Sequence, residues 1–303
     1  MKRDFLEVTD FTAAEIKESL ELAASVKQQT KAGNCPRPLE GKTIALIFHK
    51  PSLRTRISFE VGVDQLGGNT IYVTDSEIQL GKRESIYDVA KVMSRFVDGM
   101  FIRTFSHADV QQLAAHSTIP IINMLTDLTH PCQIFSDLFT IYEHKPNYEN
   151  LKISYFGDGN NITNSLLNMA TLIPMQLYIA THATTRPDEN ILKKAQAASF
   201  SEVVVTDDPL EAARDADVLY ADVWASMGDK EKINEKINLL QRFQLNEELV
   251  AHAKPDHLIM HCLPAERGRE ITDPVMDGPN SVVFDQAENR LHGQKAIMIK
   301  LLG

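Results

Sequence analysis

The sequence predicts an α/β protein with two doubly wound domains, each with a central, mainly parallel sheet flanked by helices. Apolar, strand-like runs alternate with helical patterns along the whole chain, which is typical of parallel sheets covered on both faces. A polar, proline-containing break at Lys145–Asn150 separates two sets of strands. With 303 residues, of which 43% are hydrophobic, the chain is long enough to form two hydrophobic cores.

The first half contains four predicted strands and the helices around them. Before the first strand, Ile16, Leu20, Ala23 and Ala24 recur at helical spacing, and Gly33 can end that helix. The strand-like runs are Thr43–Phe48, Thr70–Thr74, Gly99–Arg103 and Ile119–Leu125. Helical segments are expected near Ser58–Leu66, Ser85–Val97 and Ala108–His116.

The second half repeats this layout without repeating the sequence. Its strand-like runs are Lys152–Phe156, Gln176–Ala180, Glu202–Thr206, Val218–Ala221 and Leu258–His261. Its helices are expected near Ile162–Leu172, Asp188–Ala198, Pro209–Arg214, Asn246–Ala253 and Asp285–Leu302. We therefore expect one domain at residues 1–145, joined by the C-terminal helix at about 286–303, and a second domain at residues 146–285.

Composition excludes several classes of partner. The formal net charge is −10 at pH 7, so no global basic field attracts nucleic acid or an anionic membrane, and we expect neither partner. No apolar run is long enough to span a bilayer, and Met1–Phe5 lacks the apolar core of a signal peptide. The three cysteines are scattered and odd in number, which favours a reducing, cytoplasmic location. No Cys/His spacing resembles a zinc site, so no metal is expected.

The stretch Pro51–Arg56 lies between a buried strand and a predicted helix that starts at Ile57. A helix N-terminus presents unpaired N–H groups and a positive dipole end. Ser52 and Thr55 add hydroxyl donors, and Arg54 adds a planar fork of N–H groups. The stretch therefore predicts a phosphate site. Without a ligand, the same residues would form an ordinary capped helix with solvated arginines.

Other unusual motifs also follow the carboxyl ends of predicted strands, which is where ligands bind in open parallel sheets. These motifs are Arg103, His130–Gln133, Gly157–Asn161, Asp222–Gly228 and His261–Pro264. Their position at one end of the strands indicates that they belong to binding sites.

Most of these motifs also have an ordinary structural interpretation. His130 could cap the helix that follows it. Gly157–Asn161 lacks the third glycine of a dinucleotide loop, although Asn161 at a helix start could bind a substrate carboxylate or amine. Cys262 could be a buried thiol, and Arg290 could be an exposed helix residue.

The segment Asp222–Gly228 contains the only tryptophan of the chain and suggests a more specific function. Asp222 places a carboxylate at a strand end, which fits a cationic group of a substrate. Ser226 and Gly228 permit a loop that closes over a ligand. The alternative interpretation is a strand end followed by a mobile loop.

Taken in order, these motifs resemble those of the carbamoyltransferases. Pro51–Arg56 resembles the phosphate-binding Ser-x-Arg-Thr-Arg motif, and His130–Gln133 resembles the His-Pro-x-Gln motif. Asp222–Gly228 and His261–Pro264 resemble the Asp-x-Trp-x-Ser-Met-Gly and His-Cys-Leu-Pro motifs of ornithine carbamoyltransferases. The resemblance covers nearly the whole chain.

The resemblance implies ornithine carbamoyltransferase activity. Such an enzyme transfers the carbamoyl group of carbamoyl phosphate to the δ-amine of L-ornithine, giving L-citrulline and phosphate, in arginine metabolism and without a cofactor. By this resemblance, residues 1–145 bind carbamoyl phosphate, residues 146–285 bind ornithine, and the active site lies in the cleft between the two domains. The family also suggests a homotrimer or a multiple of trimers.

The resemblance assigns residues to each substrate. For carbamoyl phosphate it implies Ser52, Leu53, Arg54, Thr55, Gln79, Arg103, His130, Gln133, Cys262, Leu263 and Arg290. For ornithine it implies Asn161, Asp222, Ser226, Met227 and Cys262. The catalytic roles would fall to Arg54, Thr55, Arg103, His130 and Cys262, with Cys262 contacting the amine and not acting as a nucleophile. Two departures are Leu53, where threonine is frequent, and the basic stretch Gly81–Glu84.

Three alternatives share part of this pattern. An aspartate carbamoyltransferase shares the first half, but the second carboxylate of its substrate would fit badly beside Asp222. A carbamoyltransferase for N-acetylornithine would require a remodelled loop around Ser226–Gly228. A non-catalytic subunit on the same fold would not require the complete set of phosphate and amine motifs.

Overall fold

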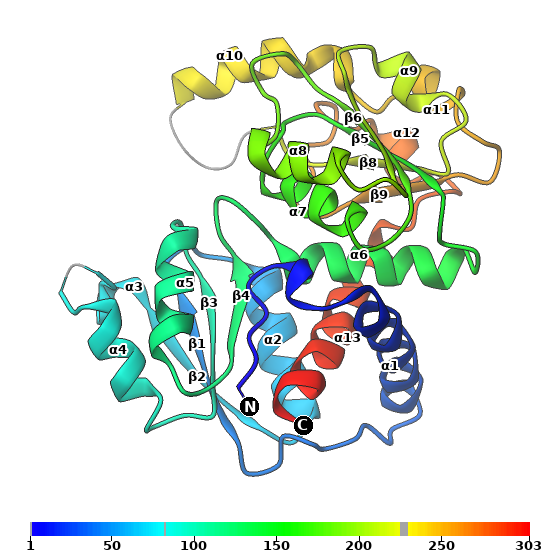
Figure 1. Ribbon diagram of the computed structural model, residues 1–303. Helices are drawn as coiled ribbons and strands as arrows, with labels where there is room; N and C mark the ends of the chain where they lie inside the picture. The colour runs from blue at the N-terminus through cyan, green and yellow to red at the C-terminus, as the bar shows by residue number, and fades with distance from the viewer. Residues whose placement is uncertain (1, 82, 225–229) are drawn as a thin grey trace. The chain divides into compact units, whose positions relative to one another are not determined.

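The computed structural model describes residues 2–81, 83–224 and 230–303, and it divides the chain into two compact units (Figure 1). Unit 1 consists of Met1–Phe139 and Asn289–Gly303, and unit 2 consists of Thr140–Glu288. The boundaries between the units fall within two helices, α6 (Pro131–His144) and α13 (Val283–Leu302), so each helix belongs partly to both units. Each unit contains its own sheet, as the alternating pattern predicts.

Unit 1 is built on a parallel, four-stranded sheet in the order β2-β1-β3-β4. The strands are β1 (Thr43–Phe48), β2 (Asn69–Thr74), β3 (Gly99–Arg103) and β4 (Ile121–Leu125). The central strand β1 is buried at every position after Thr43, which explains its continuous apolar sequence. Phe48 pairs with Arg103, so the carboxyl ends of β1 and β3 meet at the same edge.

Helices cover both faces of this sheet, with α4 and α5 on one face and α2 and α13 on the other (Figure 1). The helices and the single 3-10 turn of unit 1 before α6 are η1 (Val8–Asp10), α1 (Ala13–Lys31), α2 (Leu53–Gln65), α3 (Asp75–Ile78), α4 (Ile86–Met93) and α5 (His107–His116). The prediction that α2 begins at Ile57 or Ser58 was wrong. Ser52 is the N-cap, and its Oγ accepts a hydrogen bond from the N–H of Thr55, so Arg54 and Thr55 lie in the first helical turn.

Unit 2 is built on a parallel, five-stranded sheet in the order β7-β6-β5-β8-β9. The strands are β5 (Lys152–Phe156), β6 (Gln176–Ala180), β7 (Glu202–Thr206), β8 (Val218–Ala221) and β9 (Leu258–His261), with the predicted bounds at all five. All four strand pairs of this sheet are parallel, and the strand order reverses beside β5. This topology confirms the prediction of a doubly wound sheet.

The predicted helices of unit 2 are shorter than expected, and two further helices were not predicted. They are α7 (Asn161–Ala170), α8 (Glu189–Gln196), α9 (Pro209–Ala213), α10 (Lys230–Leu240), the 3-10 turn η2 (Gln241–Phe243), α11 (Glu247–Val250) and α12 (Asp273–Met276). The helices that were not predicted are α10, whose sequence is mostly polar, and α12, which has only four residues. The last helix, α13, starts at Val283, two residues before the predicted Asp285.

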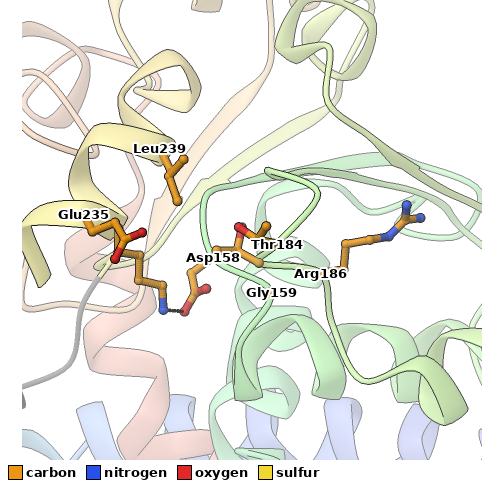
Figure 2. Close-up of a pocket in the computed structure, with 8 residues that line it drawn as sticks. Asp158, Gly159, Thr184, Arg186, Glu235 and Leu239 are labelled. Carbon is orange, nitrogen blue, oxygen red and sulfur yellow. Dashed lines mark hydrogen bonds and ion pairs between the residues drawn. The ribbon is translucent and has the colours of Figure 1, made fainter. Parts of the chain in front are cut away.

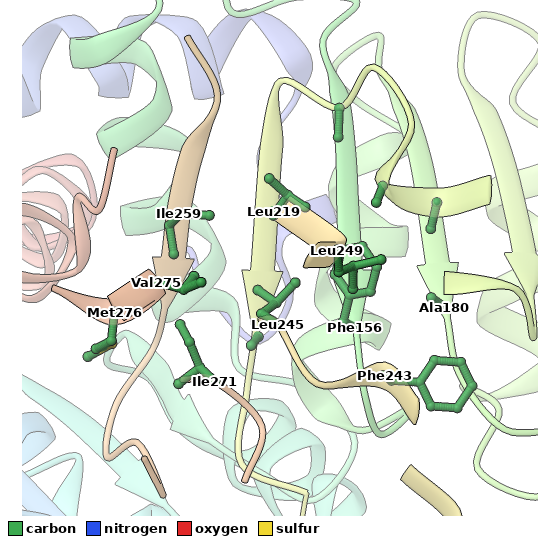
Figure 3. Packing of buried hydrophobic residues seen from close by; sticks show 14 of the residues in the cluster. Phe156, Ala180, Leu219, Phe243, Leu245, Leu249, Ile259, Ile271, Val275 and Met276 are labelled. Carbon is green, nitrogen blue, oxygen red and sulfur yellow. The ribbon is translucent and has the colours of Figure 1, made fainter. Parts of the chain in front are cut away.

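One face of the unit 2 sheet packs on a continuous apolar cluster (Figure 3). Phe156 and Leu219 from the strands meet Phe243, Leu249 and Ile271 from the segments that cover them. The only tryptophan, Trp224, also belongs to this cluster and is 1% exposed. The burial of Trp224 therefore fixes the chain directly after Asp222. Among the described residues, no helix is both long enough and apolar enough to cross a membrane.

Candidate active site

Three elements of unit 1 meet at the hydroxyl of Thr55. Thr55 lies in the first turn of α2 and is 1% exposed. Its Oγ1 accepts a hydrogen bond from Nη2 of Arg290 on α13 at 2.7 Å, and a longer one from Nη1 of Arg103 at the end of β3 at 3.4 Å. Because both lone pairs of the oxygen are engaged, the hydroxyl proton remains available as a donor. The sequence predicted these residues, and the structure brings the three together.

Two arginines at this site have no carboxylate partner among the described residues. Arg54 and Arg103 form no ion pair with any Asp or Glu of the residues that the structure describes. Burial, together with repulsion from Arg290 and Arg54, lowers the pKa of Arg103 to about 10. Guanidinium groups without a carboxylate partner, such as those of Arg54 and Arg103, form a site for an anion, and their fork geometry matches phosphate.

The N-terminus of α2 adds backbone donors to the same place. The first N–H groups of a helix have no intrahelical acceptor, and the helix dipole favours negative charge there. The side chain of Leu53 is 70% exposed, so this residue offers a ligand its backbone N–H and not its side chain. The departure from the family motif at Leu53 is therefore compatible with anion binding.

His130 and Gln133 lie at the start of α6, and both are buried in unit 1. Burial lowers the pKa of His130 well below its ordinary value, and the charges of Arg290 and Arg103 act in the same direction. The imidazole is therefore neutral near pH 7 and can donate one hydrogen bond. Nε2 of Gln133 donates to Oδ1 of Asp137 at 2.8 Å, which orients its amide oxygen to accept from a ligand.

Gln79 is not joined to this cluster in the described part of unit 1. It is an exposed residue with left-handed backbone (φ 41°) at the C-terminus of α3. Its assignment to carbamoyl phosphate stays a prediction.

The second cluster lies in unit 2 and centres on Asp222, which is 6% exposed after β8. Oδ1 of Asp222 accepts from Sγ of Cys262 at 2.9 Å and from the N–H of Val223 at 2.8 Å. Its Oδ2 accepts from Nδ2 of Asn160 at 2.7 Å. Each of these donors is formally neutral, so the carboxylate keeps its negative charge available for a cationic group.

Asn160 is the residue of this cluster whose role the sequence did not predict. Asn161 was chosen from Gly157–Asn161, whereas Asn160 is the N-cap of α7 and contacts Asp222. Its Oδ1 accepts from the N–H of Ile162, so one amide both caps the helix and holds the carboxylate. Asn161 is the first residue of α7, and its binding role stays a prediction. The preference of asparagine for the N-cap position was a signal in the sequence that could have identified Asn160.

The turn between β5 and α7 requires glycine at a defined position. A Cβ on Gly159 would lie 2.3 Å from the carbonyl oxygen of Thr185 and 2.4 Å from the backbone of Arg186. The β5–α7 turn and the loop that contains Thr185 therefore touch through their backbones, which leaves no room for a side chain at position 159.

A buried pair supports the motif that contains Cys262. His261 and Glu270 are each 0% exposed as side chains, and Nε2 of His261 lies 3.1 Å from Oε1 of Glu270. Nδ1 of His261 accepts from the N–H of Leu263 at 2.9 Å, so the proton resides on Nε2 and faces Glu270. Leu263 has left-handed backbone (φ 57°), which this contact helps to hold.

A polar pocket of about 440 Å³ opens beside the β5–α7 turn (Figure 2). Its lining residues are Asp158, Gly159, Thr184, Thr185, Arg186, Glu235, Lys236 and Leu239. Nζ of Lys236 on α10 forms an ion pair with Asp158, which the dashed line marks. Burial raises the pKa of Asp158, and Lys236 opposes that shift. The ion pair ties α10 to the turn that carries Asn160.

Ser226 and Met227, predicted to bind ornithine, lie outside the described residues.

The sequence matches both domains of one enzyme family. Residues 3–143 match the carbamoyl-P binding domain of aspartate/ornithine carbamoyltransferases, and residues 149–301 match their Asp/Orn binding domain. This chain belongs to the aspartate/ornithine carbamoyltransferase family. The resemblance that the motifs indicated is thereby confirmed.

Individual relatives within this family are similar over their full lengths. The ornithine carbamoyltransferase of Thermococcus kodakarensis is 49% identical, with 99% of this chain and 96% of the relative covered. That of Syntrophus aciditrophicus is 50% identical, with 98% and 99% covered. The solved structure of the ornithine carbamoyltransferase from Pyrococcus furiosus has a TM-score of 0.96 and 47% identity, and the match covers 100% of this chain and 97% of that one.

The uncompensated charge around Thr55 leads to a testable consequence for stability. The pKa of Arg103 is lower in the folded protein than in the unfolded chain, so the charged guanidinium group opposes folding below about pH 10. The free energy of unfolding should therefore increase as the pH rises through that value. We expect Arg103→Gln to raise the Tm of the ligand-free protein by a few degrees and to abolish the further rise that phosphate gives the wild type.

The matched control is Arg56→Gln. Arg56 is two residues from Arg54, but its Nε pairs with Glu60 at 2.9 Å on the exposed side of α2. This control should change neither Tm value appreciably. Thermal melts with and without phosphate measure both effects. An Arg103→Gln protein that is less stable than the wild type without ligand would contradict the charge argument.

Proposed function

We propose that this chain is an ornithine carbamoyltransferase, which transfers the carbamoyl group of carbamoyl phosphate to the δ-amine of L-ornithine and releases L-citrulline and phosphate. The observation that carries the proposal is the concentration of positive charge beside Thr55: Arg103 and Arg290 donate to its hydroxyl oxygen, and Arg54 lies close enough to repel Arg103. The family and the names of its relatives support the same activity.

Unit 1 supplies the groups for carbamoyl phosphate. The phosphate would lie at the N-terminus of α2, against Ser52, the N–H of Leu53, Arg54 and Arg290. The proton of Thr55 and the neutral imidazole of His130, with Arg103, would donate to the carbonyl oxygen as negative charge develops on it. Gln133, with the carbonyl of Leu263, would accept from the carbamoyl NH₂.

Unit 2 supplies the groups for ornithine. Asp222 would attract the cationic side chain, and Cys262 would contact the same amine as a neutral thiol. Asn161, Ser226 and Met227 would bind the rest of the amino acid. Because Asn160 and the β5–α7 turn hold Asp222, the carboxylate is oriented before the substrate arrives.

The chemistry depends on positioning and charge. The amine attacks the carbonyl carbon only in its deprotonated form, a C–N bond forms, the C–O bond to phosphate breaks, and phosphate leaves with the bonding electron pair. The leaving phosphate can accept a proton from the amine. Holding both reactants together lowers the entropy cost of their encounter, and the donors around Thr55 stabilise the charge that develops. No step of this sequence requires a redox change.

Three further properties follow from the family. We propose that residues 1–145 with 286–303 bind carbamoyl phosphate and that residues 146–285 bind ornithine, in a cytoplasmic homotrimer or a multiple of it. We also propose that the enzyme acts in arginine synthesis, since the Pyrococcus furiosus relative, 47% identical, is named as an anabolic ornithine carbamoyltransferase.

The direct test is turnover by the purified wild-type chain with carbamoyl phosphate and each of three amines. We expect citrulline from ornithine, and little or no product from aspartate or N-acetylornithine. Measuring the release of phosphate together with the carbamoylated product excludes simple hydrolysis of carbamoyl phosphate. A preference for aspartate or N-acetylornithine would reject the proposed substrate, and no transfer to any of the three would reject the proposed class of reaction.

Replacing Asp222 tests the origin of the preference for ornithine. Asp222→Asn keeps the shape of the side chain and removes its charge, so ornithine should lose its charge-assisted contact while carbamoyl phosphate binds normally. We expect kcat/KM for ornithine to fall by at least about tenfold. The control is Asp207→Asn, which removes an exposed carboxylate after β7 in the same unit and should leave turnover unchanged. Wild-type kinetics in Asp222→Asn would refute this account of specificity.

A further inference from the structure

A second carboxylate of unit 2 lies beside Asp222. Asp158 is in the turn between β5 and α7, and its side chain is 14% exposed. Its carbonyl oxygen accepts from the N–H of Asn160 at 2.9 Å, and the side-chain amide of Asn160 donates to Asp222. A Cβ on Gly157, the residue before Asp158, would lie 3.8 Å from the carbonyl oxygen of Asp222. Two carboxylates therefore belong to the cluster that is proposed to bind the ornithine cation.

Lys236 balances the charge of Asp158. Its Nζ on α10 forms an ion pair with a carboxylate oxygen of Asp158, and the lysine side chain is 32% exposed (Figure 2). Among the described residues, no second cation forms an ion pair with Asp158. Burial raises the pKa of Asp158, the charge of Asp222 acts in the same direction, and Lys236 opposes both. The ionised form of Asp158 therefore depends on Lys236.

The other ionisable groups around Asp158 do not replace Lys236. Arg186 lines the same pocket, but its side chain extends away from Asp158 (Figure 2). Glu235, next to Lys236 on α10, is exposed and carries the same charge as Asp158. Tyr155 on β5 is fully buried, and burial raises its pKa well above the ordinary value, so its hydroxyl is neutral near pH 7.

The hydrogen-bond partners of Asp222 leave its charge unbalanced. They are a thiol, a side-chain amide and a backbone N–H, all formally neutral. With Asp158 paired to Lys236, the described part of the cluster has one unbalanced negative charge, which matches one cationic group of a substrate. Without Lys236, the same cluster would present two.

We propose that Lys236 is a positioning residue of the ornithine site, which pairs with Asp158 so that Asp222 remains the one unbalanced carboxylate among the described residues there. This inference rests on the proposed function, because it concerns how the bound ornithine amine is kept reactive. The amine attacks carbamoyl phosphate only after it loses a proton, and each additional negative charge nearby stabilises its protonated form. By balancing Asp158, Lys236 limits this effect to the carboxylate that binds the substrate.

The pH dependence of kcat tests the charge argument, because kcat at saturating ornithine reports the groups that titrate in the enzyme–substrate complex. Lys236→Met keeps the length of the side chain and removes its charge, so the bound amine gains a second, unbalanced carboxylate as a neighbour. We expect the midpoint of the rise of kcat with pH to move up by about one pH unit. A merely structural role of Lys236 would lower kcat at every pH and leave the midpoint in place.

The matched control is Lys193→Met. Lys193 on α8 pairs with Glu189 at 2.7 Å, and both side chains are largely exposed. The same substitution at this surface ion pair of unit 2 should change neither kcat nor the midpoint. A folded Lys236→Met protein with the same midpoint as the wild type and this control would overturn the proposal.

Asp158→Asn tests the same ion pair from the other side. It leaves the positive charge of Lys236 unbalanced near the bound amine, so the midpoint should move down by about one pH unit. The double variant Asp158→Asn/Lys236→Met removes both charges and should return the midpoint to the wild-type value, as should Lys236→Arg, which keeps the charge. Shifts of the two single variants in the same direction would overturn the proposal. If Lys236→Met does not fold, an unmoved midpoint in Asp158→Asn overturns it.

The wild type shows which of the two proposals fails. If it forms citrulline from ornithine but the midpoints of all variants coincide, the role given to Lys236 is wrong and the proposed function stands. If the wild type forms no citrulline, the proposed function is wrong, and the role given to Lys236 fails with it.

Discussion

The hydroxyl oxygen of Thr55, which accepts hydrogen bonds from two arginines, is the contact on which the proposed chemistry of unit 1 depends. It brings the start of α2, the end of β3 and the early part of α13 to one atom. The arrangement concentrates positive charge in a place with little solvent, where burial disfavours the charged form of Arg103. The central strand β1 is buried after Thr43, and its pairing with β3 fixes the position of Arg103. An anion would complete the site.

Much of the fold could be predicted from the sequence, for a physical reason. Strands buried on both faces must be continuously apolar, so β1 and β3 were found with their exact bounds. The five strands of unit 2 were also found with their exact bounds, although β7 is only partly buried. Helix ends were less certain, because caps depend on single side chains. The start of α2 was misplaced since Ser52 was taken as a ligand donor and not as the N-cap. Helix α10 was missed because most of its residues are polar.

Contacts between distant residues could not be derived from periodicity. Arg290 lies 235 positions from Thr55, and its assignment came from the family resemblance. Asn160 was passed over in favour of Asn161, because the sequence does not show which amide faces Asp222. The pairing of His261 with Glu270 was not predicted either, since the proximity of these residues is set by tertiary packing alone.

The central claim is that the hydroxyl of Thr55, oriented by Arg103 and Arg290, donates a hydrogen bond to the bound carbamoyl phosphate. Calorimetric titration of carbamoyl phosphate into wild type, Thr55→Ser and Thr55→Val tests it most directly, because serine keeps the hydroxyl and valine keeps the shape. We expect wild type and Thr55→Ser to bind similarly, and Thr55→Val to bind at least about tenfold more weakly, as for a lost hydrogen bond to a charged ligand. Binding by a folded Thr55→Val protein as tight as that of the wild type would contradict the claim.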